Sequence, residues 1–217
     1  MKVKRPYAAV CLVSAILLSC PAAAQGAAFQ PAQSTADPAS ARPQPGEYQP
    51  LTPEERFTWF VKSTVGFPSL AGGVISSAWG TEFNSPREYG PNWKGFAKRY
   101  GMRLTGVSVG NALEAGLGAV LGDDPRYFSA QGRPFRQRVL HIVKFTFITY
   151  KTDGSTGPNY SFYAADVGNN FLSNLWRAPS ESDAQHAIVR IGEGFLGRMA
   201  SNAFNEFWPD VKRRLHK

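Results

Sequence analysis

The sequence predicts an all-α fold, a compact bundle of about five to six helices that follows a signal peptide and a disordered linker. Three observations predict it. Apolar residues recur at helical spacing through most of the chain after residue 50. Helix-start and helix-stop signals separate these segments. Small residues stand four apart in several of them, the spacing at which two helices come into close contact.

The N-terminus has the three-part layout of a bacterial signal peptide over residues 1–24. Lys2, Lys4 and Arg5 form a positive start, an uncharged and mostly apolar run follows, and small residues end the segment at Ala24. The apolar run is too short to cross ~30 Å of hydrocarbon as a helix, which takes about 20 residues. We therefore expect export to the periplasm or cell envelope.

Two processing routes fit this segment. Cleavage after Ala24 follows the small-residue pattern and would remove both cysteines, Cys11 and Cys20. The mature chain would then hold no disulfide and no thiol. The rival is lipidation at Cys20, because residues 17–20 resemble a lipoprotein box, although the proline after the cysteine counts against it.

Residues 25–50 form a Pro/Ala/Gln-rich linker with very few large apolar residues. Such a composition cannot bury enough surface to offset its ordering entropy, so we expect the linker to be disordered. Residues 51–217 then make a single helical domain, which is long enough for a proper core.

The first helices are marked by their ends. Residues 52–55 supply a capping hydroxyl, a proline at the first helical position and two acids in the first turn, and Gly66 ends that helix. A short helix over residues 69–79 follows. The longest predicted helix runs from about Pro91 to Gly122, with apolar residues at three-to-four spacing.

Three more helices are predicted in the second half of the chain. Residues 135–151 have an apolar helical face, although the β-branched and aromatic run over 141–150 also fits a strand. Residues 160–176 and 183–208 form the last two helices. Pro209 should kink or restart the final one, because proline removes a helical hydrogen bond.

Small residues four apart predict close helix contacts. Glycine inside a helix costs about 0.5–1 kcal/mol relative to alanine, so repeated positions suggest that another helix comes very near, as in membrane helix pairs. Arg103 and Glu114 interrupt the longest helix, which favours a soluble or interfacial bundle over a membrane span. The candidate packing positions are Gly106, Gly110, Gly116, Gly118, Gly122, Gly168 and Gly197.

Basic residues concentrate in two places. The net charge of +8 falls to +5 when Lys2, Lys4 and Arg5 leave with the signal, and most of the remainder lies in the C-terminal tail. A second concentration runs over residues 126–151 without an acidic residue. In an exported protein these residues are expected to be solvated helix faces, or to meet an anionic membrane surface or another envelope protein rather than nucleic acid. The candidate contact residues are Trp208, Lys212, Arg213 and Arg214.

No catalytic, cofactor or metal motif stands out. The three histidines lack a second ligand at metal spacing, and no nucleophile elbow or phosphate-binding loop occurs, so no cofactor is expected. Asp123 and Asp124 are weak metal candidates, although a role in the turn before Pro125 is favoured. Polar residues within the apolar helices either form an interhelical network or line a wet cleft. If a catalytic site exists, the candidate acids are Glu114, Asp166 and Glu193.

Three segments resemble a family of uncharacterised exported bacterial proteins. They are the Gly122–Phe128 cluster, the Asn169–Trp176 segment and the Phe207–Lys212 segment. The resemblance implies export and a helical, glycine-rich body. It implies no activity and therefore assigns no functional residue.

Three classes of function follow from these features. The preferred class is a non-enzymatic helical envelope protein that acts through membrane-surface or protein contacts. The alternatives are a periplasmic hydrolase or metal-dependent enzyme that uses acids between the helices, and a glycine-zipper-like oligomer that inserts in a membrane. Acids that converge in an open pocket would favour the enzyme, whereas acids paired with arginine or asparagine would favour the bundle.

Overall fold

The computed structural model describes residues 48–215, which are mostly helical with one small two-stranded sheet. The all-α prediction is confirmed in this coarse form. The predicted signal peptide and most of the predicted linker lie outside the described residues. The elements are α2 (Pro53–Val65), α3 (Phe67–Glu82), η2 (Arg87–Tyr89), α4 (Trp93–Leu121), α5 (Phe135–Phe147), β1 (Ile148–Tyr150), β2 (Thr156–Pro158), α6 (Tyr160–Leu172), η3 (Ser173–Leu175), η4 (Pro179–Glu181) and α7 (Ala184–Leu215).

Local sequence fixes the ends of the first helices. Thr52 Oγ1 accepts a hydrogen bond from the Glu55 amide at 3.2 Å, and the Glu55 carboxylate accepts one from the Thr52 amide at 2.9 Å. This capping box satisfies two amides that the helix itself leaves open. Asn92 caps α4 in the same way, with 2.9 Å from its side-chain oxygen to the Gly95 amide. Gly122 ends α4 in the left-handed region, at φ +73°.

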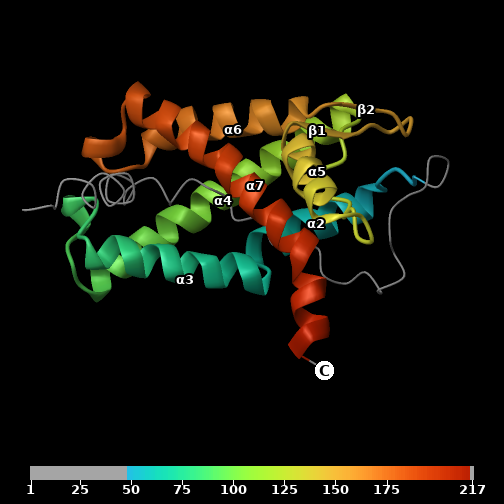
Figure 1. The fold of residues 1–217 in the computed structure, drawn as a ribbon. Coiled ribbons are helices and arrows are strands. Elements are labelled where there is room, and N and C mark those ends of the chain that lie inside the picture. Colours follow the sequence, from blue (N-terminus) through green and yellow to red (C-terminus); the bar gives the residue numbers. More distant parts are fainter. Residues whose placement is uncertain (1–47, 216–217) are drawn as a thin grey trace, which may run out of the picture.

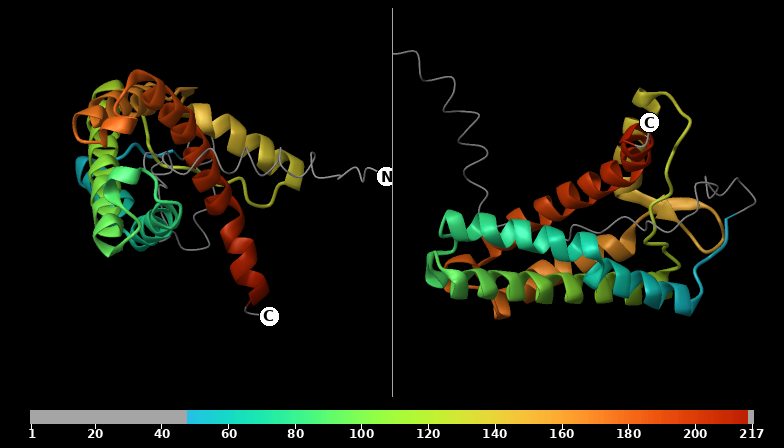
Figure 2. Two further views of the ribbon diagram at one scale, coloured as in Figure 1. Left: turned by 90° about the vertical axis from the view of Figure 1, so that its left-hand side faces the viewer. Right: turned by 90° about the horizontal axis from the view of Figure 1, so that it is seen from below.

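α4 lies at the centre of the arrangement. α2 and α3 pack along one side of it and α6 along another (Figures 1 and 2). α7 crosses the body, contacts α6 and α5, and carries its last turns away from the other helices (Figure 1). The bundle is therefore built around α4, with α6 on one side, α2 and α3 on another, and α7 joined to it mainly through α6 and α5.

The segment that fitted both helix and strand is divided between the two. α5 ends at Phe147, four residues earlier than predicted, and β1 pairs antiparallel with β2 with Ile148 opposite Pro158 and Tyr150 opposite Thr156. The β-branched residues Ile148 and Thr149 favour extended backbone here. In a smaller difference, α6 ends at Leu172, and a 3-10 turn covers most of the remaining predicted helix.

Pro209 does not restart the last helix, because α7 continues through it to Leu215. Arg138 on α5 holds the turn on both sides of the proline. It lies 2.6 Å from the Glu206 carboxylate and 2.5 Å from the Asp210 carboxylate. These two ion pairs tie α7 to α5 on both sides of the proline.

Candidate functional site

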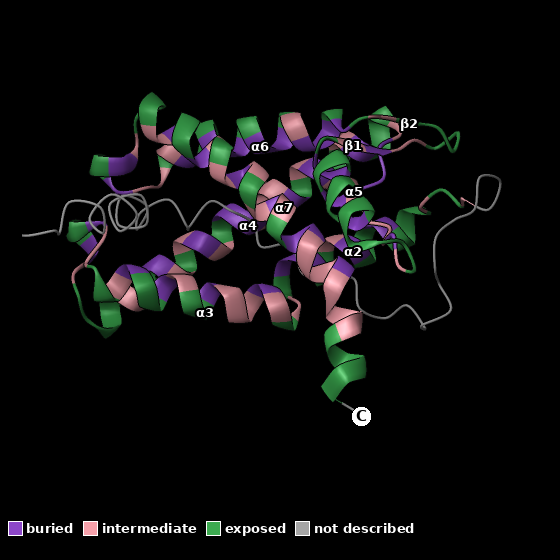
Figure 3. Ribbon diagram, viewed as in Figure 1, coloured by how far each residue is buried: buried purple, intermediate pink, exposed green. Residues whose placement is uncertain are grey.

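The helices bury polar and small side chains along their contact faces. On α3 the buried residues are Ser69, Gly73, Ser77 and Gly80. On α4 they recur every three or four residues, and all but one are polar or glycine: Gly95, Arg99, Arg103, Gly106, Val107, Asn111, Glu114 and Gly118. The same holds on α7, where Ala187, Arg190, Gly194, Arg198, Ser201, Asn202 and Glu206 are buried. Figure 3 shows the buried residues along the helices, and because most of them are polar or glycine we call this interior the polar core.

The polar core has its charged centre where α4, α6 and α7 meet. Arg198 on α7 donates to the Glu114 carboxylate on α4 over 2.7 Å, and both side chains are nearly inaccessible, at 6% and 2% exposed. Asp166 on α6 is their electrostatic neighbour and accepts a hydrogen bond from Asn170 at 2.9 Å. Two of the three candidate acids therefore come together, but each has an arginine or an asparagine as its partner.

The third candidate acid does not join this centre. Glu193 is half-buried on α7 and interacts electrostatically with Arg177 and Arg190. An apolar groove of about 520 Å³ runs between α2 and the C-terminal half of α4. None of the three candidate acids lines it. Its walls are Leu51, Pro53, Arg56, Phe57, Phe60, Ala112, Ala115, Gly116, Ala119 and Thr152.

Asp123 and Asp124 organise the turn that follows α4. Asp123 pairs with Lys151 and accepts a hydrogen bond from the Ser161 amide at 2.8 Å. Asp124 pairs with Arg126 at 2.7 Å and accepts from the Tyr48 hydroxyl at 2.9 Å. Burial and the nearby Asp124 carboxylate raise the pKa of Tyr48, so this hydroxyl keeps its proton and donates a hydrogen bond to Asp124.

The partners of the two aspartates are cations and backbone groups of the protein itself. Within residues 48–215, no three side chains of His, Cys, Asp or Glu come together as a set that could hold a metal ion. The arrangement is that of a structural turn in which Lys151 and Arg126 balance the two carboxylates. Among the described residues, the candidate metal site at Asp123 and Asp124 therefore has no third ligand from a His, Cys, Asp or Glu side chain.

A second buried acid site forms around Glu206, which the sequence places among the polar residues of the apolar helices but not among the candidate catalytic acids. Its carboxylate accepts hydrogen bonds from the Tyr127 hydroxyl at 2.9 Å and from the Ala130 amide at 2.7 Å, besides the ion pair with Arg138. Burial and the Glu206 charge raise the pKa of Tyr127. The hydrogen bond from Arg138 lowers the pKa of Asp210. The sequence signal for this site was the basic run over residues 126–151, which contains no acid. A buried arginine of this run, such as Arg138, must therefore pair with a carboxylate from another part of the chain.

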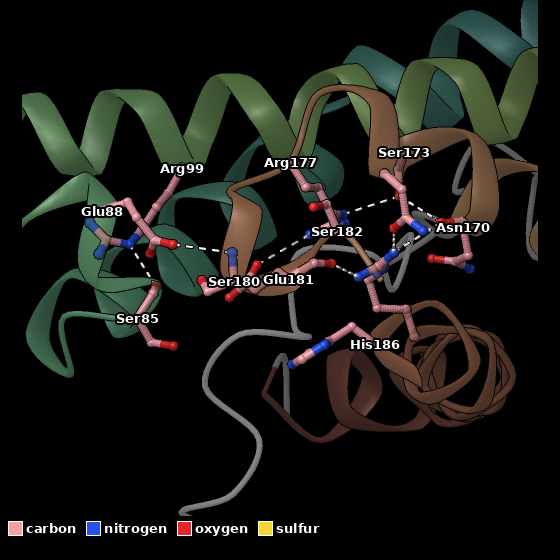
Figure 4. A network of polar contacts seen from close by, with 12 residues as sticks. Ser85, Glu88, Arg99, Asn170, Ser173, Arg177, Ser180, Glu181, Ser182 and His186 are labelled. Carbon is pink, nitrogen blue, oxygen red and sulfur yellow. Dashed lines mark hydrogen bonds and ion pairs between the residues drawn. The ribbon is translucent and has the colours of Figure 1, made fainter. Parts of the chain in front are cut away.

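Arginine side chains also hold the loops at the end of the bundle that lies opposite to α5 in Figure 1, and Figure 4 shows their polar contacts. Arg99 is fully buried and donates to the carbonyl oxygens of Ser85, Pro86 and Gly90 over 2.8–2.9 Å. The Ser180 amide donates to the Glu88 carboxylate at 3.2 Å, which ties η4 to η2. Buried carbonyls need donors, and a planar guanidinium can satisfy several at once.

Two further arginines hold the connection between α6 and α7. Arg190 donates to the carbonyl oxygens of Glu181 at 2.8 Å and Asn170 at 2.9 Å. Arg177 lies 3.9 Å from the Glu181 carboxylate, where burial lowers the pKa of Arg177 and raises that of Glu181. These arginines bind the chain's own backbone and carboxylates, which is a structural use.

Three of the predicted packing glycines lie in helix contacts. Gly106 is buried, and a Cβ on Gly110 would lie 3.1 Å from the Asn169 side chain of α6. A Cβ on Gly118 would lie 2.6 Å from the Arg56 guanidinium of α2. These positions allow polar side chains to reach the α4 backbone.

The other four glycines differ. Gly122 is the left-handed cap of α4 rather than a helix contact. Gly116 is exposed in the wall of the apolar groove, with no atom of a neighbouring element within 4 Å of its Cβ position. Gly168 is exposed and reaches only Leu113, at 4.0 Å, while Gly197 is half-buried.

Gly194 of α7, a position that the sequence pattern did not select, lies directly against Asp166 of α6. We expect Gly194→Ala to lower the free energy of unfolding by about 1–3 kcal/mol, because overpacking a core displaces side chains. The new Cβ would lie 2.6 Å from Asp166 Oδ2 and 2.7 Å from Asp166 Cγ. The matched control is Gly192→Ala, where the Cβ meets nothing within 4 Å and should gain about 0.5–1 kcal/mol. Thermal unfolding of the full chain measures both, and equal shifts would contradict the contact.

The outer surfaces of the same helices are apolar. α3 has no charged residue before Glu82. The charged residues of α4 after Gly101 and of α6 are all buried: they are Arg103, Glu114 and Asp166. Among the described residues α4 alone is long and apolar enough to cross a membrane, and only 28% of its most apolar stretch is buried. The exposed large residues on these helices and α7 include Phe67, Val74, Ile75, Trp79, Val120, Leu121, Val167, Phe171, Leu172, Ile188, Val189 and Leu196.

No protein-family model, curated protein or solved structure matches this chain.

Proposed function

We propose that this chain is a non-catalytic helical protein of the cell envelope whose outer surface lies in the hydrocarbon of a membrane, with α4 as a spanning segment. A signal peptide exports it, and a linker precedes a bundle held by small-residue contacts. One observation carries the proposal: α4 after Gly101 and α6 bury their charged side chains, α3 has none before Glu82, and these helices and α7 expose large apolar ones. This distribution is the reverse of that in a protein surrounded by water.

The energetics of solvation support this reading. Soluble monomers rarely expose contiguous apolar patches larger than a few hundred Å², whereas lipid hydrocarbon accepts such surfaces. A charge in the bilayer costs about 2.5–3.5 kcal/mol or more, and intramembrane charges therefore face the bundle interior in pairs. Glu114 and Arg198 do so. α4 has 29 residues, which gives about 43 Å of helix and exceeds the ~30 Å hydrocarbon thickness.

The arrangement of the acids argues against the enzyme alternative. Four of the candidate acids form ion pairs or hydrogen bonds with arginine, asparagine or lysine side chains of this chain: Glu114, Asp166, Asp123 and Asp124. A hydrolase would need two of them to face a shared open space. In a membrane the same pairs have a different use, since they hold the helices in register where the hydrophobic effect between helices is absent.

Alkaline extraction of membranes tests the proposal. The full-length chain is produced in a bacterial host, and its membranes are washed at high pH, which releases peripheral proteins. We expect the chain to stay in the membrane pellet and to need detergent for release. An intact mass of the product shows whether it begins at Gln25 or carries an acyl group on Cys20.

The variant Cys20→Ser separates the two ways of staying in the membrane. If the helices insert, this variant remains in the pellet like the parent chain. If it becomes soluble, an acyl group is the anchor and the insertion proposal is wrong. A parent chain that is released by alkali and stays soluble without detergent would overturn the proposal as well, and would assign the apolar faces to contacts between protein chains.

A further inference from the structure

The outer face of α5 combines large apolar residues with cations. Phe135 is 71% exposed and Leu140 is 58% exposed, and Val139, Val143 and Phe147 are exposed beside them. Arg136 and Lys144 are exposed on the same helix, and Arg133 precedes it. The inner face, with Ile142 and Phe145, is buried in the body, so α5 presents its basic and apolar side outward.

The last turns of α7 extend this surface. Val211 and Leu215 are exposed there, among the exposed Lys212, Arg213 and Arg214. Phe135 of α5 stacks on Phe207 of α7 with ring centroids 5.6 Å apart, which joins the two helices. We name the exposed residues of α5 together with Val211–Leu215 the basic apolar face. Figure 3 shows the exposed end of α7 projecting from the body.

The acids around this face are neutralised by arginine, and Glu206 is also buried. Residues 125–152 contain no Asp or Glu. From α7, Glu206 is bound by Arg138 and Tyr127, and Asp210 is bound by Arg138 and Arg213. Within residues 48–215, Arg133, Arg136, Lys144, Lys212 and Arg214 form no ion pair with a carboxylate. The face therefore carries a net positive charge toward its surroundings.

The direction of α5 fits a membrane surface. α5 runs across the end of the bundle rather than along α6 (Figures 1 and 2). It lies beside the C-terminal end of α4, because Asp123, which follows α4, bridges to Lys151, just after β1. If α4 spans the bilayer, α5 lies where the hydrocarbon ends and the headgroups begin.

We propose that the basic apolar face binds anionic phospholipid headgroups and so fixes this end of the protein at the membrane surface. The inference rests on the proposed function. Exposed apolar residues enter the acyl boundary, and the cations between them meet lipid phosphates. A nucleic acid or an acidic soluble protein would leave Phe135, Leu140 and Leu215 in water, which is why the lipid is the favoured partner.

Vesicle flotation tests this partner. The purified full-length chain is mixed from detergent with vesicles of phosphatidylcholine alone or with added phosphatidylglycerol. We expect the apparent partition coefficient to rise about tenfold or more with phosphatidylglycerol, and the gain to shrink at high salt. The double variant Arg136→Glu/Lys144→Glu should lose the gain and keep its binding to phosphatidylcholine.

The control is Lys94→Glu/Lys98→Glu, which reverses two exposed lysines at the start of α4, away from α5. It should keep the preference for phosphatidylglycerol. If the parent chain inserts equally well in both vesicles, the headgroup inference fails and the proposed function stands. If both double variants lose the preference alike, the effect is one of total charge and the assignment to α5 is wrong. If the chain floats with neither vesicle, both proposals fail.

Discussion

Replacing Arg198 by alanine is expected to lower the free energy of unfolding by about 3–5 kcal/mol, the cost of breaking a buried ion pair on one side. The substitution leaves the Glu114 carboxylate, which is 2% exposed, without the guanidinium now 2.7 Å away. Asp166 then remains close to Glu114 with no cation between them. It also removes the packing of Arg198 over the Phe162 ring, at 4.3 Å.

Thermal unfolding of the purified full-length chain, followed by circular dichroism, measures this effect. The control is Arg213→Ala, whose pair with Asp210 is exposed and whose loss should cost less than about 1 kcal/mol. The double variant Glu114→Leu/Arg198→Met should recover most of the stability, because replacing both members of a buried pair with apolar residues is often neutral. A single variant as stable as Arg213→Ala would show that the pair does not hold α4 to α7.

The helices were predictable because their ends are local signals. Thr52, Pro53 and Glu55 make a capping box without help from the rest of the fold, and Gly122 ends α4 wherever that helix packs. Of the two expectations for Pro209, a kink or a restart, the restart does not occur, because α7 continues to Leu215. Glu206 and Asp210, which bind α7 to Arg138 on both sides of this proline, are far from Arg138 in the sequence, so no local signal marks them.

The polar core was only partly predictable. Glu114 and Asp166 stood out as acids within apolar helices, but the sequence could not say that they share a neighbour, since Arg198 lies on a third helix. Arg99 shows a further limit. Its acceptors are backbone carbonyls, which every residue carries and which no sequence pattern marks.

The side of each helix that faces inward was the hardest feature to predict. Apolar residues recur at three-to-four spacing in α4, but the same spacing fits an apolar core in water and a polar core in lipid. Small residues four apart fit both as well. Which side of α4 faces inward depends on partners from other helices. Arg103 donates a hydrogen bond to the Ser69 carbonyl oxygen of α3, and Asn111 donates one to the Thr64 hydroxyl of α2.

The substitution Ile75→Lys tests whether water or lipid surrounds α3. Ile75 is 70% exposed on the outer face of α3. If water surrounds α3, a lysine there is a surface change within about 0.5 kcal/mol of neutral. If lipid surrounds it, the ammonium group costs about 2.5–3.5 kcal/mol, unless it reaches the headgroups. We expect the larger cost, measured as the loss of folded protein in bilayer discs on heating.

The control variant lies on the same helix. Glu82→Lys places the same side chain at the exposed C-terminal end of α3, where a cation also suits the helix dipole, so it should be neutral or slightly stabilising. A large cost at Ile75 with none at Glu82 requires a low dielectric around the middle of α3. Because the contacts inside the bundle are unchanged in both variants, that difference can come only from what covers the outer face.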